Sequence, residues 1–94
     1  MRKYELMIIF PIEDDLFKEG LEKVQAVLKE FGAEIESEES YGNRELMYEV
    51  KKRTHGRYQL LHIQASPAKI VDIDQKFKLN NNILKCMFVK KEDE

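Results

Sequence analysis

The spacing of apolar residues changes along the first third of the chain, from that of a strand to that of a helix. Residues 3–10 (KYELMIIF) are apolar on nearly both faces of an extended chain, which predicts a central strand. Apolar residues then recur at spacings of three and four, from Phe17 to Phe31, and predict a helix over about 16–31 that ends at Gly32. Asp14 or Asp15 stands where a side chain can cap the start of this helix.

The remainder of the chain supplies three more strands and a second helix. Residues 33–40 begin a second strand that continues through 44–50, where Leu46, Tyr48 and Val50 alternate with polar neighbours. Residues 58–65 (YQLLHIQA) and 83–90 (ILKCMFVK) predict the third and fourth strands. Between them, Ser66 and Pro67 open a helix with a buried stripe of Ile70, Ile73 and Phe77, and the NNN run at 80–82 ends it.

The predicted order is strand, helix, strand, strand, helix, strand. Two split βαβ halves of this kind form a ferredoxin-like α+β sandwich, a four-stranded antiparallel sheet with both helices on one face. We therefore expect a single domain over residues 1–94.

One face of this sheet is left without helices. If Leu6, Ile8 and Phe10 face the helices, alternation sends an apolar set to the open side. That set is Met7, Ile9, Leu60, His62, Met87 and Val89, framed by Lys3, Glu5, Tyr58 and Lys85. So much apolar surface favours a protein partner or self-association. The alternative is a scatter of exposed apolar residues, which is normal on protein surfaces.

The net charge of −2 hides a segregation of charge. Residues 13–40 hold ten acidic residues and three lysines, a balance of −7, whereas residues 43–57 have a balance of +3. The basic segment lies at the turn between the second and third predicted strands, which we expect to be long and polar, with its cations free of packing. Such a tip can bind a phosphate backbone, or it can be a solvated turn.

The sequence lacks the patterns of enzymes and metal proteins. The chain contains neither a glycine-rich phosphate loop nor a nucleophile elbow, and His55 and His62 have no Cys or carboxylate at ligand spacing. The lone Cys86 lies in an apolar run, which favours a small core residue over a nucleophile. We expect no catalysis, cofactor, metal or small-molecule substrate. The longest apolar run, residues 6–12, is too short for a membrane span, and a cytoplasmic location is expected.

Three segments carry a resemblance to a known family. They are MRKYELMIIFP at the start, the spaced pattern Gly42-x-Arg44-x-Leu46-x-Tyr48-x-Val50-x-Lys52 followed by Tyr58 and LLHIQA, and LNNNILKCMFVK near the end. Together they resemble the bacterial ribosomal small-subunit protein six family from end to end. The resemblance implies a ferredoxin-like fold that binds the central domain of 16S ribosomal RNA as a heterodimer with small-subunit protein eighteen.

Under this interpretation the two surfaces have separate roles. The basic residues expected at 16S ribosomal RNA are Arg2, Arg44, Lys51, Lys52, Arg53 and Arg57. The residues expected at the partner protein are Lys3, Met7, Ile9, Tyr58, Leu60, His62, Lys85 and Met87. The alternative function is a self-associating ferredoxin-like module, such as a small-ligand sensor that dimerises through its open sheet face.

Overall fold

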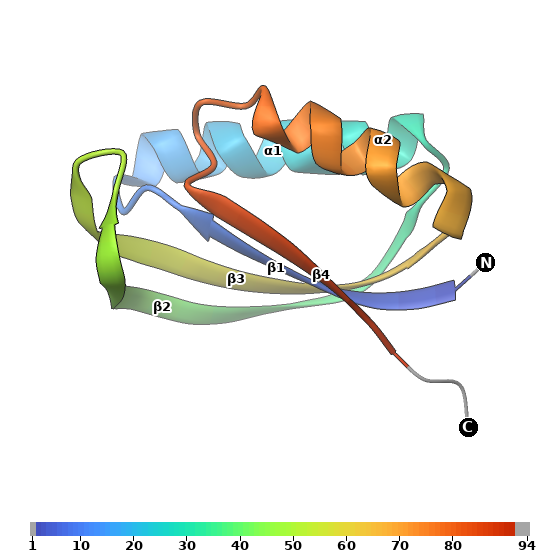
Figure 1. Ribbon diagram of the computed structural model, residues 1–94, viewed down its shortest axis with the longest axis horizontal. Coiled ribbons are helices and arrows are strands. Elements are labelled where there is room, and N and C mark those ends of the chain that lie inside the picture. Colours follow the sequence, from blue (N-terminus) through green and yellow to red (C-terminus); the bar gives the residue numbers. More distant parts are fainter. Residues whose placement is uncertain (1, 92–94) are drawn as a thin grey trace.

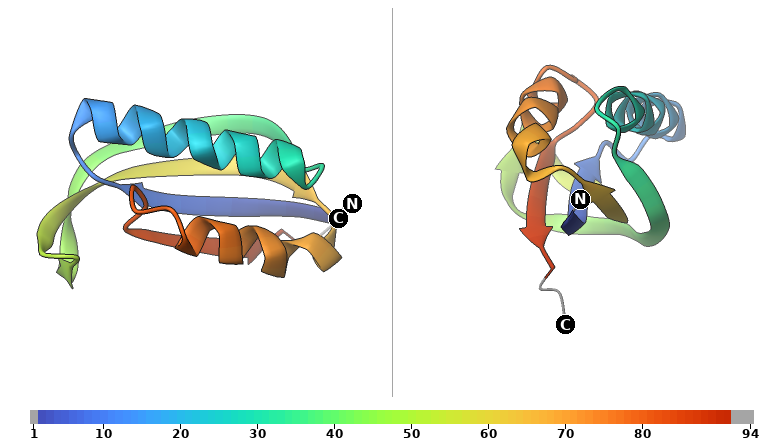
Figure 2. Two further views of the ribbon diagram at one scale, coloured as in Figure 1. Left: turned by 90° about the horizontal axis from the view of Figure 1, so that it is seen from above. Right: turned by 90° about the vertical axis from the view of Figure 1, so that its right-hand side faces the viewer.

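A computed structural model describes residues 2–91 and shows the predicted order of elements (Figure 1). The elements are β1 (Arg2–Phe10), α1 (Asp14–Glu30), β2 (Glu34–Val50), β3 (Arg53–Ala65), α2 (Pro67–Lys78) and β4 (Lys85–Lys90). The strands form one antiparallel sheet in the order β2-β3-β1-β4. Both helices lie side by side on one face of that sheet, and the other face is open (Figure 2). The predicted ferredoxin-like architecture is confirmed.

The main core lies between the sheet and the helices. From β1 and β3 it takes Leu6, Ile8, Phe10, Leu61 and Ile63, none of which is exposed to solvent. The predicted helical stripes face it. Phe17, Val24, Leu28, Ile73 and Phe77 are buried, and Leu21, Phe31 and Ile70 are half-buried against them. Cys86 and Phe88 of β4 pack against the same core, as their alternation predicts.

The two ends of α1 were predicted with different success. The helix ends as expected at Gly32, whose φ of 73° lets the amides of Gly32 and Ala33 reach the carbonyls of Lys29 and Leu28. At the start, Glu13 is the N-cap and no side chain makes a capping hydrogen bond. The prediction that Asp14 or Asp15 caps α1 is wrong, since both lie within its first turn.

The turn between β2 and β3 also differs from the prediction. Lys51 and Lys52 form a tight two-residue turn with φ of 50° and 64°, and Val50 pairs directly with Arg53. The expectation of a long polar loop is wrong, because a lysine pair does not have the Asn-Gly character by which such turns are recognised. The tip of this hairpin curls out of the sheet toward the side on which the helices lie (Figure 1).

A bulge in β2 breaks the predicted alternation just before this turn. Glu45 pairs with His55 and Val50 with Arg53, so four residues of β2 lie opposite one residue of β3. Leu46 is consequently buried, whereas Tyr48, predicted on the same face, is 65% exposed.

Candidate partner and nucleic-acid interface

All eight residues predicted at the protein partner lie on the open face of the sheet. The strand register explains their grouping, because opposed residues of paired strands share a face. Ile9 is opposite Tyr58 and Lys85, and Met7 is opposite Leu60 and Met87. His62 and Lys3 continue the same face toward the start of β1. The structure therefore brings this predicted set together.

Part of this open face is already covered by the chain itself. Ile9, Leu46 and Leu84 form a second small core, with Val50 and Tyr58 packed against it. Ile9 and Leu60 are each only 7% exposed, so neither is an accessible anchor, although the predicted side is correct. Gly56 permits this cover, since a Cβ there would lie 2.3 Å from Cγ2 of Ile9.

A shallow apolar groove of about 250 Å³ remains between the hairpin and β4. Ile9, Leu46 and Tyr58 are among the residues that line it, and Met47, Tyr48 and Met87 line it with more exposed side chains. Met47 is 97% exposed and Met87 is 47% exposed. The ammonium of Lys85 lies 3.4 Å from the Tyr48 hydroxyl and 5.8 Å from its ring centroid. This groove is the accessible apolar part of the open face.

The end of the open face near the start of β1 is polar. The Lys91 ammonium lies 2.6 Å from Nδ1 of His62, and Nε2 of His62 lies 2.7 Å from a carboxylate oxygen of Glu39. An ammonium can only donate, so Nδ1 of His62 is the acceptor from Lys91, and Nε2 is the ring nitrogen that faces Glu39. Lys3 lies 3.9 Å from the carboxylate of Glu36. Lys3 and His62 are thus members of cross-strand polar pairs.

The two arginines of β3 are engaged within the protein. Arg53 donates to both carboxylate oxygens of Glu13, at 2.8 and 2.9 Å. This hydrogen bond is the main reason that the pKa of Glu13 is lowered. Arg57 donates to Asp14 at 2.9 Å, and its guanidinium lies over the ring of Phe17. The prediction that these cations have little packing is wrong, because the hairpin tip closes onto the acidic start of α1.

The other four predicted RNA-contacting residues are dispersed. Lys51 donates to the backbone carbonyl of Ile83 at 3.0 Å, which ties the turn to the segment before β4. Arg44 donates to the carbonyl of Tyr41 and lies 5.7 Å from the centroid of its ring. Lys52 is exposed at the apex of the turn, with no hydrogen bond or ion pair to residues 2–91. Arg2 is exposed at the opposite end of the sheet, paired in register with Ala65.

Sequence reasoning missed the lysines of α2. Lys76 and Lys78 are in the last turn of α2, and Lys78 lines a hollow next to β4. Their signal was available, since α2 and β4 together hold five lysines and two aspartates. Asp14 was assigned only to the helix start and Glu13 only to the acidic segment 13–40, because nothing local connects them with Arg53 and Arg57.

The described residues contain no sign of metal or thiol chemistry. Across residues 2–91 no three His, Cys, Asp or Glu side chains are grouped so as to hold a metal ion. Burial, with a hydrogen bond to Asp74 and its charge, raises the pKa of the Cys86 thiol to about 11. Neither helix in this part of the chain is long and apolar enough to cross a membrane.

Comparison with known proteins assigns the family. The sequence profile described as ribosomal protein S6 matches residues 3–90. The chain is 50% identical to the small ribosomal subunit protein bS6 of Treponema denticola, an alignment that covers 99% of this chain and 100% of the relative. The chain belongs to the ribosomal protein S6 family. The bS6 of Halalkalibacterium halodurans is 40% identical, with 99% of this chain and 100% of that relative covered.

A solved structure of the S6 family supports the fold independently. The crystal structure of 30S ribosomal protein S6 from Thermotoga maritima superimposes with a TM-score of 0.84, covering 96% of this chain and 87% of that one. The sequence identity is 20%, so this structural similarity is evidence for the fold alone. Membership of the bS6 relatives' family confirms a structural protein of the small ribosomal subunit, not an enzyme, located on the ribosome in the cytoplasm.

Proposed function

We propose that this S6 family member binds the central domain of 16S ribosomal RNA as a heterodimer with small-subunit protein eighteen. The observation that carries the proposal is the open sheet face, where the apolar groove stays accessible after the hairpin has closed over Ile9. The family assignment supports a ribosomal setting for that face.

The groove suits a protein better than a nucleobase. Its exposed margin is formed by Met47, Tyr48 and Met87, and methionine side chains adapt to varied apolar partners. RNA-binding sheets instead present aromatic residues on the central strands, where this chain has Met7, Ile9, Leu60 and His62. Glu5, Glu36 and Glu39 lie at the polar end of the open face, near the start of β1, which favours a basic partner.

The RNA contact is proposed for basic residues outside this face. Lys52 and Lys51 are the cations of the hairpin turn that no carboxylate neutralises in the described residues, and Arg44 and Arg2 are exposed elsewhere. Arg53 and Arg57 would have to leave Glu13 and Asp14 to reach a phosphate, which weakens their part of the original assignment. The protein has a net charge of −2, so we expect weak RNA binding by the lone chain and tight binding by the heterodimer.

Charge substitutions on the groove test the partner assignment. We expect Met47→Glu and Met87→Glu to weaken capture of protein eighteen about tenfold or more, since a buried anchor contributes about 2 kcal/mol. Val71→Glu is the matched control, because Val71 is 64% exposed on α2, on the helical side. Leu60→Glu is unsuitable, since a buried residue would report on folding. Capture that is unchanged by both methionine variants would contradict the proposal.

Size-exclusion chromatography separates the heterodimer from the alternative of a self-associating module. The proposed function expects a monomer that elutes as a heterodimer when protein eighteen is added. A stable homodimer that the Met87→Glu variant dissociates would instead favour self-association. Filter binding to 16S RNA with and without protein eighteen completes the test, and tight, specific binding by the lone chain would contradict the expected role of the partner.

A further inference from the structure

The fold places acidic residues toward one edge of the sheet and basic residues toward the other. α1 and β2 carry eleven acidic and four basic residues, whereas α2 and β4 carry five lysines and two aspartates. Strands β2 and β4 are the opposite edges of the sheet, and α2 lies above β4 (Figure 2). The edge formed by α2 and β4 is therefore basic, although no segment of the sequence there is strongly basic.

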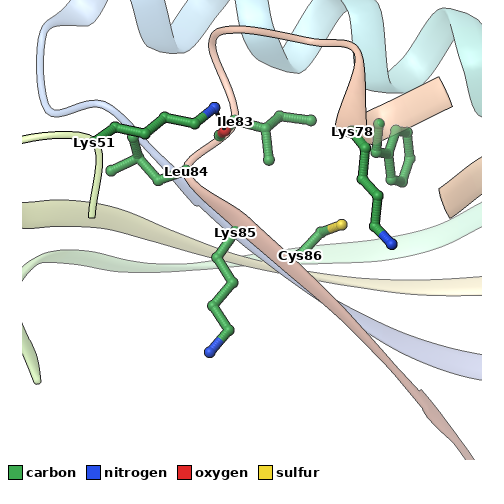
Figure 3. A pocket seen from close by; sticks show the side chains of 7 residues that line it. Lys51, Lys78, Ile83, Leu84, Lys85 and Cys86 are labelled. Atoms are coloured by element: carbon green, nitrogen blue, oxygen red, sulfur yellow. Dashed lines mark hydrogen bonds between the residues drawn. The ribbon is translucent and has the colours of Figure 1, made fainter. Parts of the chain in front are cut away.

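A hollow of about 300 Å³ lies on this edge, between the hairpin turn, the end of α2 and the start of β4. Its apolar lining includes Phe77, Ile83 and Cys86, and lysines from the β2–β3 turn, α2 and β4 line it as well. In Figure 3, Lys51 reaches the Ile83 carbonyl from one side and Lys78 extends from α2 on the other. The stem of Lys85 lines the hollow, while its ammonium points away toward Tyr48.

What this hollow can bind depends on whether the charge of each lysine is already neutralised by a carboxylate. Lys51 donates one hydrogen bond to a neutral carbonyl, so its position is fixed and its charge is not neutralised. Lys78 forms an i,i+4 pair with Asp74 at 3.1 Å, but its side chain is 72% exposed, and such surface pairs are weak. The two arginines Arg53 and Arg57 of β3 differ, because each has a carboxylate at 2.8–2.9 Å. Two cations that are available to an external anion, Lys51 and Lys78, thus flank the hollow.

We propose that the lysine-flanked hollow formed by Lys51, Lys78 and the start of β4 binds the phosphate backbone of RNA. The inference rests on the proposed function. It assigns the electrostatic contact with RNA to the lysines of this hollow, in place of Arg53 and Arg57. Lysine ammoniums act as point charges on phosphates, so this contact positions the protein without selecting bases. The apolar groove on the open face remains available to the partner protein, because Lys51 and Lys78 lie outside it.

The test measures binding of the heterodimer to 16S central-domain RNA as a function of salt. We expect the double variant Lys51→Met and Lys78→Met to lose about tenfold in affinity at low salt and to flatten the salt slope by about two units. The control is Lys18→Met with Lys23→Met, which changes the net charge equally on α1. Lys78→Met alone leaves the turn intact. We expect this variant to flatten the salt slope by about one unit, and this effect does not depend on the Lys51 hydrogen bond.

The outcomes distinguish the two proposals. The lysine site is overturned if the wild-type heterodimer binds RNA but the Lys78→Met variant and the double variant have the same affinity and salt slope as the α1 control. That result leaves the proposed function standing. A wild-type heterodimer that does not bind the RNA overturns both. A similar loss on RNAs of different sequence is expected, and a loss confined to one sequence contradicts a phosphate contact.

Discussion

The guanidinium of Arg57 lies over the ring of Phe17, with its central carbon 3.7 Å from the ring centroid. The same group donates to Asp14 at 2.9 Å, so one side chain joins β3 to the first turn of α1 in two ways. Phe17 itself packs edge-on against Phe10 of the main core, with centroids 5.1 Å apart. A residue that sequence reasoning assigned to RNA is thus built into the packing of the hairpin.

We expect Arg57→Ala to destabilise the protein by about 1–2 kcal/mol, because it removes a stacked cation and its ion pair. Arg57→Lys should recover part of this loss, since lysine keeps the charge without the flat stacked group. Chemical denaturation measures both. Arg44→Ala is the control, with an expected change within about 0.5 kcal/mol. A loss of RNA affinity with unchanged stability would return Arg57 to the RNA-binding set.

The hairpin turn should be stabilised by Lys52→Gly. Lys52 has a φ of 64°, a left-handed conformation that glycine adopts without the steric cost of a Cβ, so we expect a gain of about 1 kcal/mol. Lys52→Ala removes the same charge and keeps the strain, and should show no gain. We expect a higher melting temperature for Lys52→Gly than for Lys52→Ala. Equal melting temperatures would contradict backbone strain at this position.

Gly56 should tolerate no side chain while Ile9 is in place. A Cβ at position 56 would lie 2.3 Å from Cγ2 of Ile9 and 3.3 Å from Cδ2 of Leu46, so Gly56→Ala should cost about 1–3 kcal/mol by overpacking. Ile9→Ala removes the clashing methyl group. A double-mutant cycle should therefore show that Gly56→Ala is less harmful in the Ile9→Ala background. Additive losses would mean that the contact is relieved in another way.

The Cys86 thiol should react slowly in the folded protein. Burial, and then the hydrogen bond and charge of Asp74, raise its pKa to about 11, so little thiolate is present at pH 8. We expect alkylation to be far slower in the native than in the denatured protein. Asp74→Asn should lower the pKa and shift the pH–rate curve to lower pH, because it removes the negative charge opposite the thiol. An unshifted curve would show that burial alone controls the thiol.

The order of elements and the two faces of the sheet could be predicted from the sequence. Alternation along β1 and β3 separated Leu6 and Leu61 from Met7 and Leu60 correctly, because side-chain direction in a strand follows from local geometry. The stop of α1 at Gly32 was equally local, since it needs only one residue with a positive φ. The family could be recognised for a related reason, because its motifs consist of residues at short, regular spacings.

Which charged and apolar groups remain accessible depends on contacts between distant parts of the chain, and these appear only in the folded structure. Arg53 meets Glu13 across 40 residues of chain, and Arg57 meets Asp14 across 43. These pairs depend on how far the β2–β3 hairpin bends toward α1, which the bulge before Val50 and the absence of a side chain at Gly56 control. The same bend buried Ile9 and set Lys51 beside β4. Local periodicity carries no information on such pairings, since they arise from the path of the hairpin in three dimensions.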